Sequence, residues 1–508
     1  MRRSSSVESA GRAGQPLRCR LTVIVVAVTL GLVAAACGGG EEVGSPSLVE
    51  PRPGDVSETA AGDESEIDVE TVPAGFEGLS LEAKIAGFLA DQNSTKGALV
   101  AAAMGESGDP RWGPWLLDLY RLGRSTRIDR AATVAFADLS GVEPTGQRTD
   151  DYRRYGNWVY DGGVDPGDGY REWKLGVYAT IDPAFADLLS GIPDDIVLSQ
   201  IQWGGVTRGG IPELNEPERV PADAADWMTD EELVLGVVVD GFAVAYPLRI
   251  LGHHELANDD IGGVPVSMVY CTLCRSGLLF DRRVGDMVLD FQTSGLLIES
   301  NKIMVDRQTD TLWRHQTGIG LAGPLEGEAL AQYPVLTTSW GEWTDEHADT
   351  EVLAIPAPIF PDGGASPEQP AIAYSYDAGE AYRFYYEDPD VWFPVFDTPS
   401  VFELKEPVLG LSDGSVHLAI QLEGLIDAGP QVFVVGETNV AAVPTSSGAL
   451  VYDLTGADRQ AGTLAGIVSA DSEQLRLDDG SVSARMVVPQ LFWFAWFGRH
   501  PGTDWWPR

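Results

Sequence analysis

The stretch LVLGVVVDGFAVAYPL, residues 233–248, decides how the larger part of this chain is interpreted. Two runs rich in β-branched and aromatic residues flank the Asp-Gly pair at 240–241, which is typical of a strand, a tight turn and a second strand. A related stretch returns at 408–422, where Val-Leu-Gly, Asp-Gly and Ala-Ile-Gln-Leu stand in the same order. We therefore expect a duplicated, β-rich region.

A second repeated pattern in the sequence supports the duplication. Two tryptophans, a histidine and a threonine recur with the same spacing in each half, at Trp340, Trp343, His347 and Thr350 and again at Trp493, Trp496, His500 and Thr503. Positions i, i+3 and i+7 share one face of a helix. Each repeat is thus predicted to close with a short amphipathic helix that packs its tryptophans on the sheet, with its histidine as a capping or packing residue.

The residues before the duplicated region have a different spacing of apolar side chains. Residues 79–90 and 115–122 place apolar side chains three and four positions apart, which indicates helices. The predicted fold class is α+β: a helical N-terminal domain over 72–204, then two related β-rich repeats at 205–360 and 361–508, each closed by a tryptophan-rich helix.

The amino terminus is typical of a lipoprotein signal peptide. Arginines precede an apolar run that ends in Ala-Ala-Ala-Cys37. Residues 1–36 are predicted to be cleaved and Cys37 to carry lipid, which would anchor an exported protein to the outer face of the cytoplasmic membrane. The alternatives are an uncleaved anchor or an ordinary secretory signal. Residues 37–71, rich in acidic residues, Gly, Ser and Pro, are predicted to be a disordered tether.

The charge of the chain restricts its partners. It has 34 basic and 76 acidic residues, a formal net charge of −42. Nucleic acid and anionic lipid surfaces are therefore poor partners. The membrane, reached through the lipid on Cys37, is the one partner that the sequence predicts; a small-molecule or protein partner stays undefined.

Cys271 and Cys274 remain as the thiols available for chemistry, because Cys19 leaves with the signal peptide and Cys37 is lipidated. They lie between two runs predicted to be strands. Three interpretations stay open: a disulfide, inert or redox-active; a zinc or copper site completed by histidine; or two reduced, buried cysteines. The histidines that could complete a metal site are His253, His254 and His315.

The second copy serves as an internal control. Its matching stretch, residues 426–440, has no cysteine and no histidine. Any chemical site is therefore expected in the first repeat, with Cys271 and Cys274 as the candidate catalytic residues and His254 close to them. A zinc-peptidase helix is rejected, because Asn258 stands where the second histidine of that motif is required.

From about residue 205 to the end, the chain resembles the domain of unknown function 3179 family of bacterial and archaeal proteins. The resemblance rests on Tyr-Cys-x-Leu-Cys at 270–274 and on an ordered series of further positions, including His254, Glu255, Asn258, Asp259, Asp306, Arg307 and Trp313. Thr272 and Arg275 depart from the Pro and Gly that the family usually has, and Gly252 stands in place of Trp. The resemblance implies no reaction; it implies that His254 and the two cysteines belong to a shared pattern.

Two functions follow as hypotheses. The first is an extracytoplasmic lipoprotein with a thiol-disulfide or metal centre at Cys271 and Cys274 near His254. The second is a non-catalytic surface binding or scaffold protein in which the two cysteines form a structural disulfide. Whether the protein is an enzyme is left open at this point.

Overall fold

The computed structural model of the chain describes residues 78–90, 92–123, 125–358, 374–379, 381–455 and 460–507. The predicted signal peptide 1–36, the tether 37–71 and the lipidation site Cys37 lie outside these residues. Within the described part, every helix is too short or too polar to cross a membrane.

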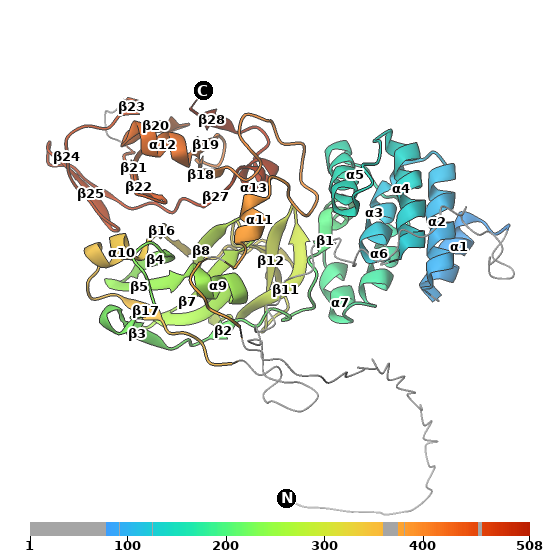
Figure 1. Cartoon of the computed structure of the whole chain (residues 1–508), viewed down its shortest axis with the longest axis horizontal. Helices are drawn as coiled ribbons and strands as arrows, with labels where there is room; N and C mark the ends of the chain where they lie inside the picture. The colour runs from blue at the N-terminus through green and yellow to red at the C-terminus, as the bar shows by residue number, and fades with distance from the viewer. Residues whose placement is uncertain are drawn as a thin grey trace, which may run out of the picture. The chain divides into compact units, whose positions relative to one another are not determined.

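The first part of the described chain is helical, as predicted. Helices of this region lie side by side (Figure 1), with neighbours in contact. They bury Trp115, Trp173 and several tyrosines in a common core, because their apolar residues recur three and four positions apart. The helices are α1 (Leu81–Ala90), α2 (Ser94–Glu106), α3 (Gly113–Leu122), α4 (Thr126–Ser140), α5 (Arg148–Gly162), α6 (Tyr170–Tyr178), α7 (Ala184–Ser190) and α8 (Asp195–Gln200).

The rest of the chain is β-rich and contains six sheets of three or more strands. In strand order, the first sheet is β1 (Ile201–Trp203), β11 (Phe291–Ile298), β12 (Asn301–Asp306), β13 (Leu312–Arg314) and β14 (Ile319–Ala322), and the second is β15 (Gln332–Tyr333), β8 (Ser276–Asp281), β7 (Val264–Cys271), β6 (Leu256–Ile261) and β2 (Leu214–Asn215). The third sheet is β16 (Val335–Ser339), β4 (Leu233–Val239), β5 (Phe242–Pro247), β17 (Glu351–Leu353) and β3 (Arg219–Pro221), and the fourth is β27 (Gln490–Phe492), β18 (Pro407–Ser412), β19 (His417–Gln421) and β28 (Asp504–Trp506). The fifth sheet is β22 (Ala449–Asp453), β21 (Thr438–Pro444), β20 (Gln431–Val435) and β23 (Gly462–Thr463), and the sixth is β24 (Ile467–Ala470), β25 (Gln474–Leu477) and β26 (Val482–Ala484). β9 (Arg283–Val284) pairs with β10 (Met287–Val288). Short helices connect the strands: α9 (Leu248–His254), α10 (Trp340–Glu346), α11 (Arg383–Glu387), α12 (Leu422–Ala428) and α13 (Trp493–Arg499).

We read the six sheets as the blades of a six-bladed β-propeller, so the expected division into two β-rich repeats is corrected. The physical reason is that the two halves share one of their apolar clusters. Leu336 and Trp343 of the first half belong to the same buried cluster as Tyr452 and Leu475 of the second. Other clusters lie within a single half, and the shared cluster packs the two halves against each other.

The duplication seen in the sequence corresponds to two sheets built alike. In the first, β16 runs antiparallel to β4, β4 to β5, and β17 lies parallel to β5. In the second, β27, β18, β19 and β28 repeat this order and these directions. The predicted tryptophan helices, α10 and α13, follow β16 and β27, and Trp343 and Trp496 are buried.

Candidate functional site

The two cysteines lie in the turn between β7 and β8, so the predicted tight connection between strands is confirmed. Cys271 ends β7, and Ser276 begins β8. The backbone N–H of Cys274 donates a hydrogen bond to Sγ of Cys271 at 3.3 Å, and Arg275 has the left-handed φ of 51°. Both cysteines are buried and unbonded to each other, so the predicted disulfide is not found.

His315 joins this pair from the end of β13. The ligand atoms of Cys271, Cys274 and His315 all lie within 4.8 Å of one another, and all three residues are buried. The Nε2 atom of His315 lies 3.2 Å from the carbonyl oxygen of Val269. A carbonyl only accepts, so Nε2 carries a proton, and in the neutral form of the imidazole Nδ1 holds the lone pair. In the described part of the chain, Nδ1 has no hydrogen-bond partner.

The environment separates the two thiols electrostatically. Burial alone raises the pKa of Cys271, but contacts with Cys274 and His315 outweigh it and leave this pKa well below its ordinary value. The pKa of Cys274 is raised well above its ordinary value, by burial and then by the neighbouring Cys271, against the opposing hydrogen bond of Ser276. Cys271 is therefore the more acidic thiol of the pair and Cys274 the less acidic one.

Tyr385 of α11, in the segment that connects the two halves, belongs to the same buried apolar cluster as the two cysteines. Its side chain is fully buried, and its hydroxyl has no partner among the described residues. Burial, followed by the electrostatic effect of the cysteine pair, raises its pKa well above the ordinary value. The ammonium of Lys405 lies 3.4 Å from the centre of the ring, a cation–π contact that holds the ring in place. Among the described residues, Nδ1 of His315 and the hydroxyl of Tyr385 thus have no hydrogen-bond partner, and His315 lies with the thiols.

A buried ion pair lies on the Cys271 side of the site. Lys302 pairs with Glu255 and donates a hydrogen bond to Thr293 at 2.9 Å. The other oxygen of Glu255 accepts a hydrogen bond from Thr272 at 2.7 Å. A cavity of about 30 Å³ is lined by these residues and Cys271. The sequence analysis did not predict a role for Lys302. The available signal was a lysine beside the apolar residues of the strand Asn301–Asp306, which the structure shows to be buried throughout.

His254 does not share this site, which corrects the expectation that it lies beside the sulfurs. Its Nδ1 bonds the carbonyl of Pro212 at 2.8 Å, and its Nε2 bonds the hydroxyl of Tyr376 at 2.6 Å. Burial lowers its pKa to about 4. His253 packs on Tyr374 and is likewise absent from the cysteine group. With both nitrogens of His254 engaged, His315 is the histidine that the fold brings to the thiols.

The remaining residues of the predicted pattern stabilise the surrounding strands. Asn258 bonds both backbone groups of Phe291, and Asp259 accepts hydrogen bonds from Tyr246 and Arg219. Asp306 accepts from the backbone of Thr309 and from the indole of Trp313, while Arg307 pairs with Glu213. These contacts hold strands and turns in place, and none of them reaches the cysteines.

Two thiols and an imidazole lone pair, all buried, form a donor set that suits a soft or borderline metal ion. Zinc takes Cys and His ligands, and copper(I) favours thiolates. The backbone carbonyl behind Nε2 of His315 is the kind of partner that orients a metal-ligating histidine.

Comparison with known proteins gives one match. Residues 208–503 match the sequence model of a family described as "Protein of unknown function (DUF3179)". Neither a curated protein nor a solved structure matches the chain.

Proposed function

The chain belongs to this DUF3179 family, whose description assigns no activity, and from that premise we propose that its β-rich region holds a zinc or copper ion on Cys271, Cys274 and His315. The observation that carries the proposal is the buried Nδ1 of His315, which has no hydrogen-bond partner within the described ranges. A buried polar atom without a partner costs free energy unless something binds it. A metal ion would satisfy Nδ1 and the thiolate of Cys271 together, and would lower the pKa of Cys274 enough to deprotonate it.

The number of protein ligands bears on what such a centre could do. Structural zinc sites are closed by four protein ligands, whereas catalytic sites keep a position open beside three. This site offers two cysteines and one histidine as ligands. We therefore favour a centre that binds or transforms a small ligand over a purely structural one.

A thiol-disulfide centre is the second candidate. One cysteine of lowered pKa beside one of raised pKa is the asymmetry that thiol-disulfide exchange uses. Exposed fractions of 2% and 0% argue against it, because they shield both sulfurs from a protein substrate. The scaffold alternative with a structural disulfide stays a weaker proposal, since the sulfurs are unbonded.

The test is elemental analysis with thiol titration of the full chain, purified without chelator. We expect about one equivalent of zinc or copper per chain, lost in His315→Ala and kept in the control His417→Ala. His417 lies outside the cysteine group and is partly exposed. A metal-free protein that cycles reversibly between two thiols and a disulfide would favour the redox alternative, and unchanged metal content in His315→Ala would refute the ligand set.

We also propose that the mature protein is exported and anchored through lipid on Cys37, which follows the charged, apolar and small-residue segments of residues 1–36. The membrane would then be its partner, and the net charge of −42 disfavours nucleic acid. Mass spectrometry of the protein from membranes is expected to find an acylated Cys37 at the amino terminus. A full-length chain that begins at Met1 would contradict this.

A further inference from the structure

A small polar cavity adjoins the candidate metal centre. Its volume is about 30 Å³, and Cys271, Glu255, Thr293 and Lys302 are among the residues that line it. A cavity needs about 10–15 Å³ to hold one water-sized molecule. This one therefore has room for a ligand of two or three heavy atoms and excludes an ordinary organic substrate.

Lys302 also stands opposite one of the candidate metal ligands. Strands β12 and β13 pair with Ile303 opposite Arg314. His315 is next in the chain, and its backbone N–H donates a hydrogen bond of 3.3 Å to the carbonyl of Lys302. Residues opposite each other in antiparallel strands carry their side chains on the same face, with Cβ atoms about 4.5–5.5 Å apart. The cavity is thus lined by one candidate ligand, Cys271, and by the residue opposite a second, His315.

The polar groups of this wall have hydrogen-bond donors to spare. An ammonium carries three donors. Glu255 and Thr293 accept two of those of Lys302, and the structure gives it no third partner within the described ranges. The hydroxyl of Thr293 accepts from Lys302, and among the described residues nothing accepts its own proton. Both carboxylate oxygens of Glu255 are engaged, one by Lys302 and the other by Thr272. The wall therefore offers donors to a ligand that accepts hydrogen bonds.

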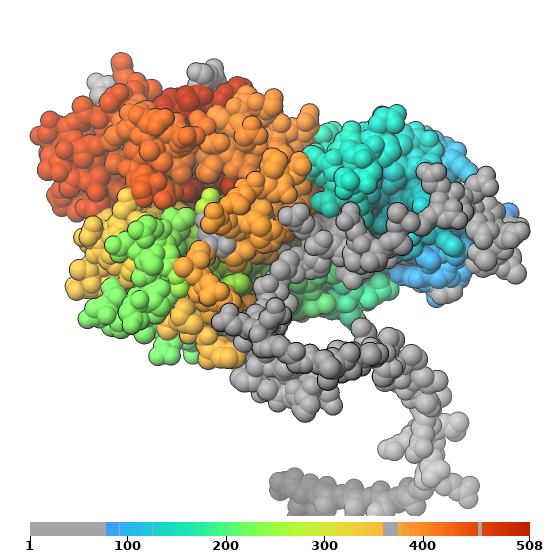
Figure 2. Space-filling view, in the orientation of Figure 1, coloured from blue at the N-terminus to red at the C-terminus, as the bar shows by residue number. Residues whose placement is uncertain are grey.

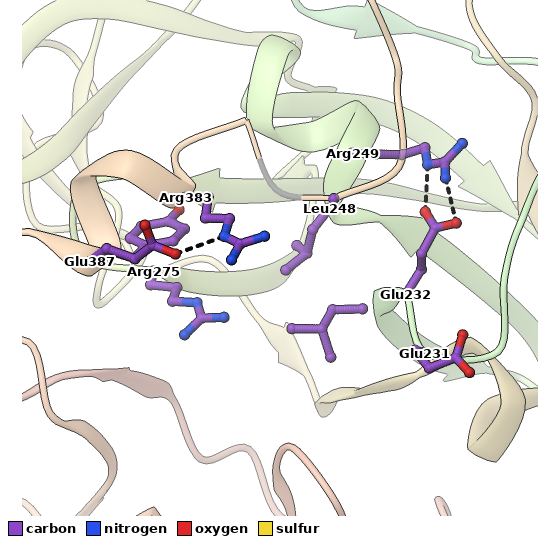
Figure 3. A pocket seen from close by; sticks show the side chains of 10 residues that line it. Glu231, Glu232, Leu248, Arg249, Arg275, Arg383 and Glu387 are labelled. Carbon is purple, nitrogen blue, oxygen red and sulfur yellow. Dashed lines mark hydrogen bonds and ion pairs between the residues drawn. The ribbon is translucent and has the colours of Figure 1, made fainter.

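A larger cleft, of about 540 Å³, gives no comparable argument. It is lined in part by residues of α11, whose orange surface lies between the green strands and the red carboxyl-terminal part in Figure 2. Figure 3 shows Arg249 paired with Glu232 on one side of this cleft and Arg383 paired with Glu387 on the other. Because these charges are satisfied within the wall, the four residues do not call for a charged ligand.

We propose that the small cavity binds an inorganic anion of two or three heavy atoms, which occupies the open position of the metal centre and accepts hydrogen bonds from Lys302 and Thr293. The inference rests on the proposed metal on Cys271, Cys274 and His315, because three protein ligands leave one position open. The metal ion would attract one end of the anion and the ammonium of Lys302 the other. Hydrogen bonds from a charged donor are about twice as strong as neutral ones, so Lys302 is expected to contribute most.

The test uses sodium azide as the probe and benzoate as an anion too large for the cavity, with binding measured by calorimetry on the metal-loaded full chain. Wild type is expected to bind azide at least about tenfold more tightly than benzoate. The double variant Lys302→Met with Glu255→Gln removes the ion pair without leaving one charge buried alone. It should weaken azide binding about tenfold or more, because a charge-assisted hydrogen bond is lost. The matched control is Arg249→Met with Glu232→Gln, which removes a largely buried pair outside the cavity and should bind azide like the wild type.

A second variant tests the cavity without touching the ion pair. Thr293→Val removes only the hydroxyl, so azide binding should weaken by about two- to tenfold. Its control is Thr338→Val, at a buried threonine of β16 that lies outside the cavity. Metal content, measured in each preparation, is expected to equal that of the wild type.

The outcomes separate failure of the anion site from failure of the metal centre. A metal-loaded wild type that binds no azide would overturn this inference and leave the centre standing, as would unchanged azide binding in the double variant and in Thr293→Val. Benzoate binding as tight as that of azide would overturn the assignment to a small anion. A wild type without metal would refute the centre itself and, with it, the anion site.

Discussion

At the scale of single residues, two buried histidines differ only in their partners. His254 and His315 are each fully buried. Both nitrogens of His254 are hydrogen-bonded, whereas the Val269 carbonyl occupies one nitrogen of His315 and leaves the other as a lone pair near the thiols. His254 is therefore a structural residue that connects Pro212 and Tyr376, and His315 is the one able to act as a ligand.

This structural role of His254 predicts a pH dependence of stability. Burial lowers its pKa from 6.5 to about 4, so the unfolded chain takes up a proton at a higher pH than the folded chain. The stabilisation is full above pH 6.5 and is lost as the pH falls toward 4, by about 3 kcal/mol at most. In His254→Gln the free energy of unfolding should fall less steeply over this range. Urea unfolding at several pH values measures this, and equal slopes in the two proteins would refute the role.

At the scale of elements, a glycine in a strand makes room for each tryptophan helix. A Cβ on Gly236 of β4 would lie 2.4 Å from the ring of Trp343, and one on Gly410 of β18 would lie 2.2 Å from the ring of Trp496. Each indole also donates a hydrogen bond of 2.9 Å to the threonine seven residues later. Helices α10 and α13 are thus fixed on their sheets by the same packing.

Substituting either glycine by alanine should dislodge the helix above it. Gly236→Ala and Gly410→Ala are each expected to lower the free energy of unfolding by roughly 1–3 kcal/mol, because the backbone and a buried indole leave no space for the methyl group. The control is Gly502→Ala, where nothing lies within 4 Å of the added atom. Denaturant titration measures all three. A loss in Gly502→Ala as large as in the other two would contradict the packing argument.

At the scale of the whole molecule, the helical and β-rich regions are joined by buried polar groups. The ammonium of Lys174 lies 2.8 Å from a carboxylate oxygen of Asp118 and donates a hydrogen bond of 2.7 Å to the carbonyl of Ile201, the first residue of β1. Arg121 bonds the carbonyl of Trp203 at the other end of that strand. Since β1 pairs with β11, the helices hold the outer strand of a sheet.

Removing Lys174 should destabilise both regions together. Lys174→Met is expected to cost about 3–5 kcal/mol, because the carboxylate of Asp118 is left buried without its cation. Arg171→Gln, which breaks a partly exposed pair with Asp195, should cost less than about 1 kcal/mol and serves as the control. Calorimetry would show whether the helical region unfolds on its own. A loss of stability in Lys174→Met no larger than that in Arg171→Gln would contradict the coupling.

The sequence by itself determined the elements and the position of the cysteines. Apolar spacing predicted the helical region, and runs rich in β-branched and aromatic residues around Asp-Gly predicted the hairpin of β4 and β5. The turn that holds Cys271 and Cys274 followed from the strand-like runs on both sides of it. These are local properties, because backbone preference and side-chain periodicity act within a few residues.

Only the tertiary structure decided which histidine meets the thiols. His254 ends α9, and Glu255 then takes a left-handed φ of 57°, so that Glu255 reaches Thr272 beside Cys271 while His254 bonds Pro212 and Tyr376. His315 arrives from β13, whose place depends on its pairing with β12. Sheet pairing and a shared core are set by contacts between distant segments, and no local pattern in a single sequence specifies them.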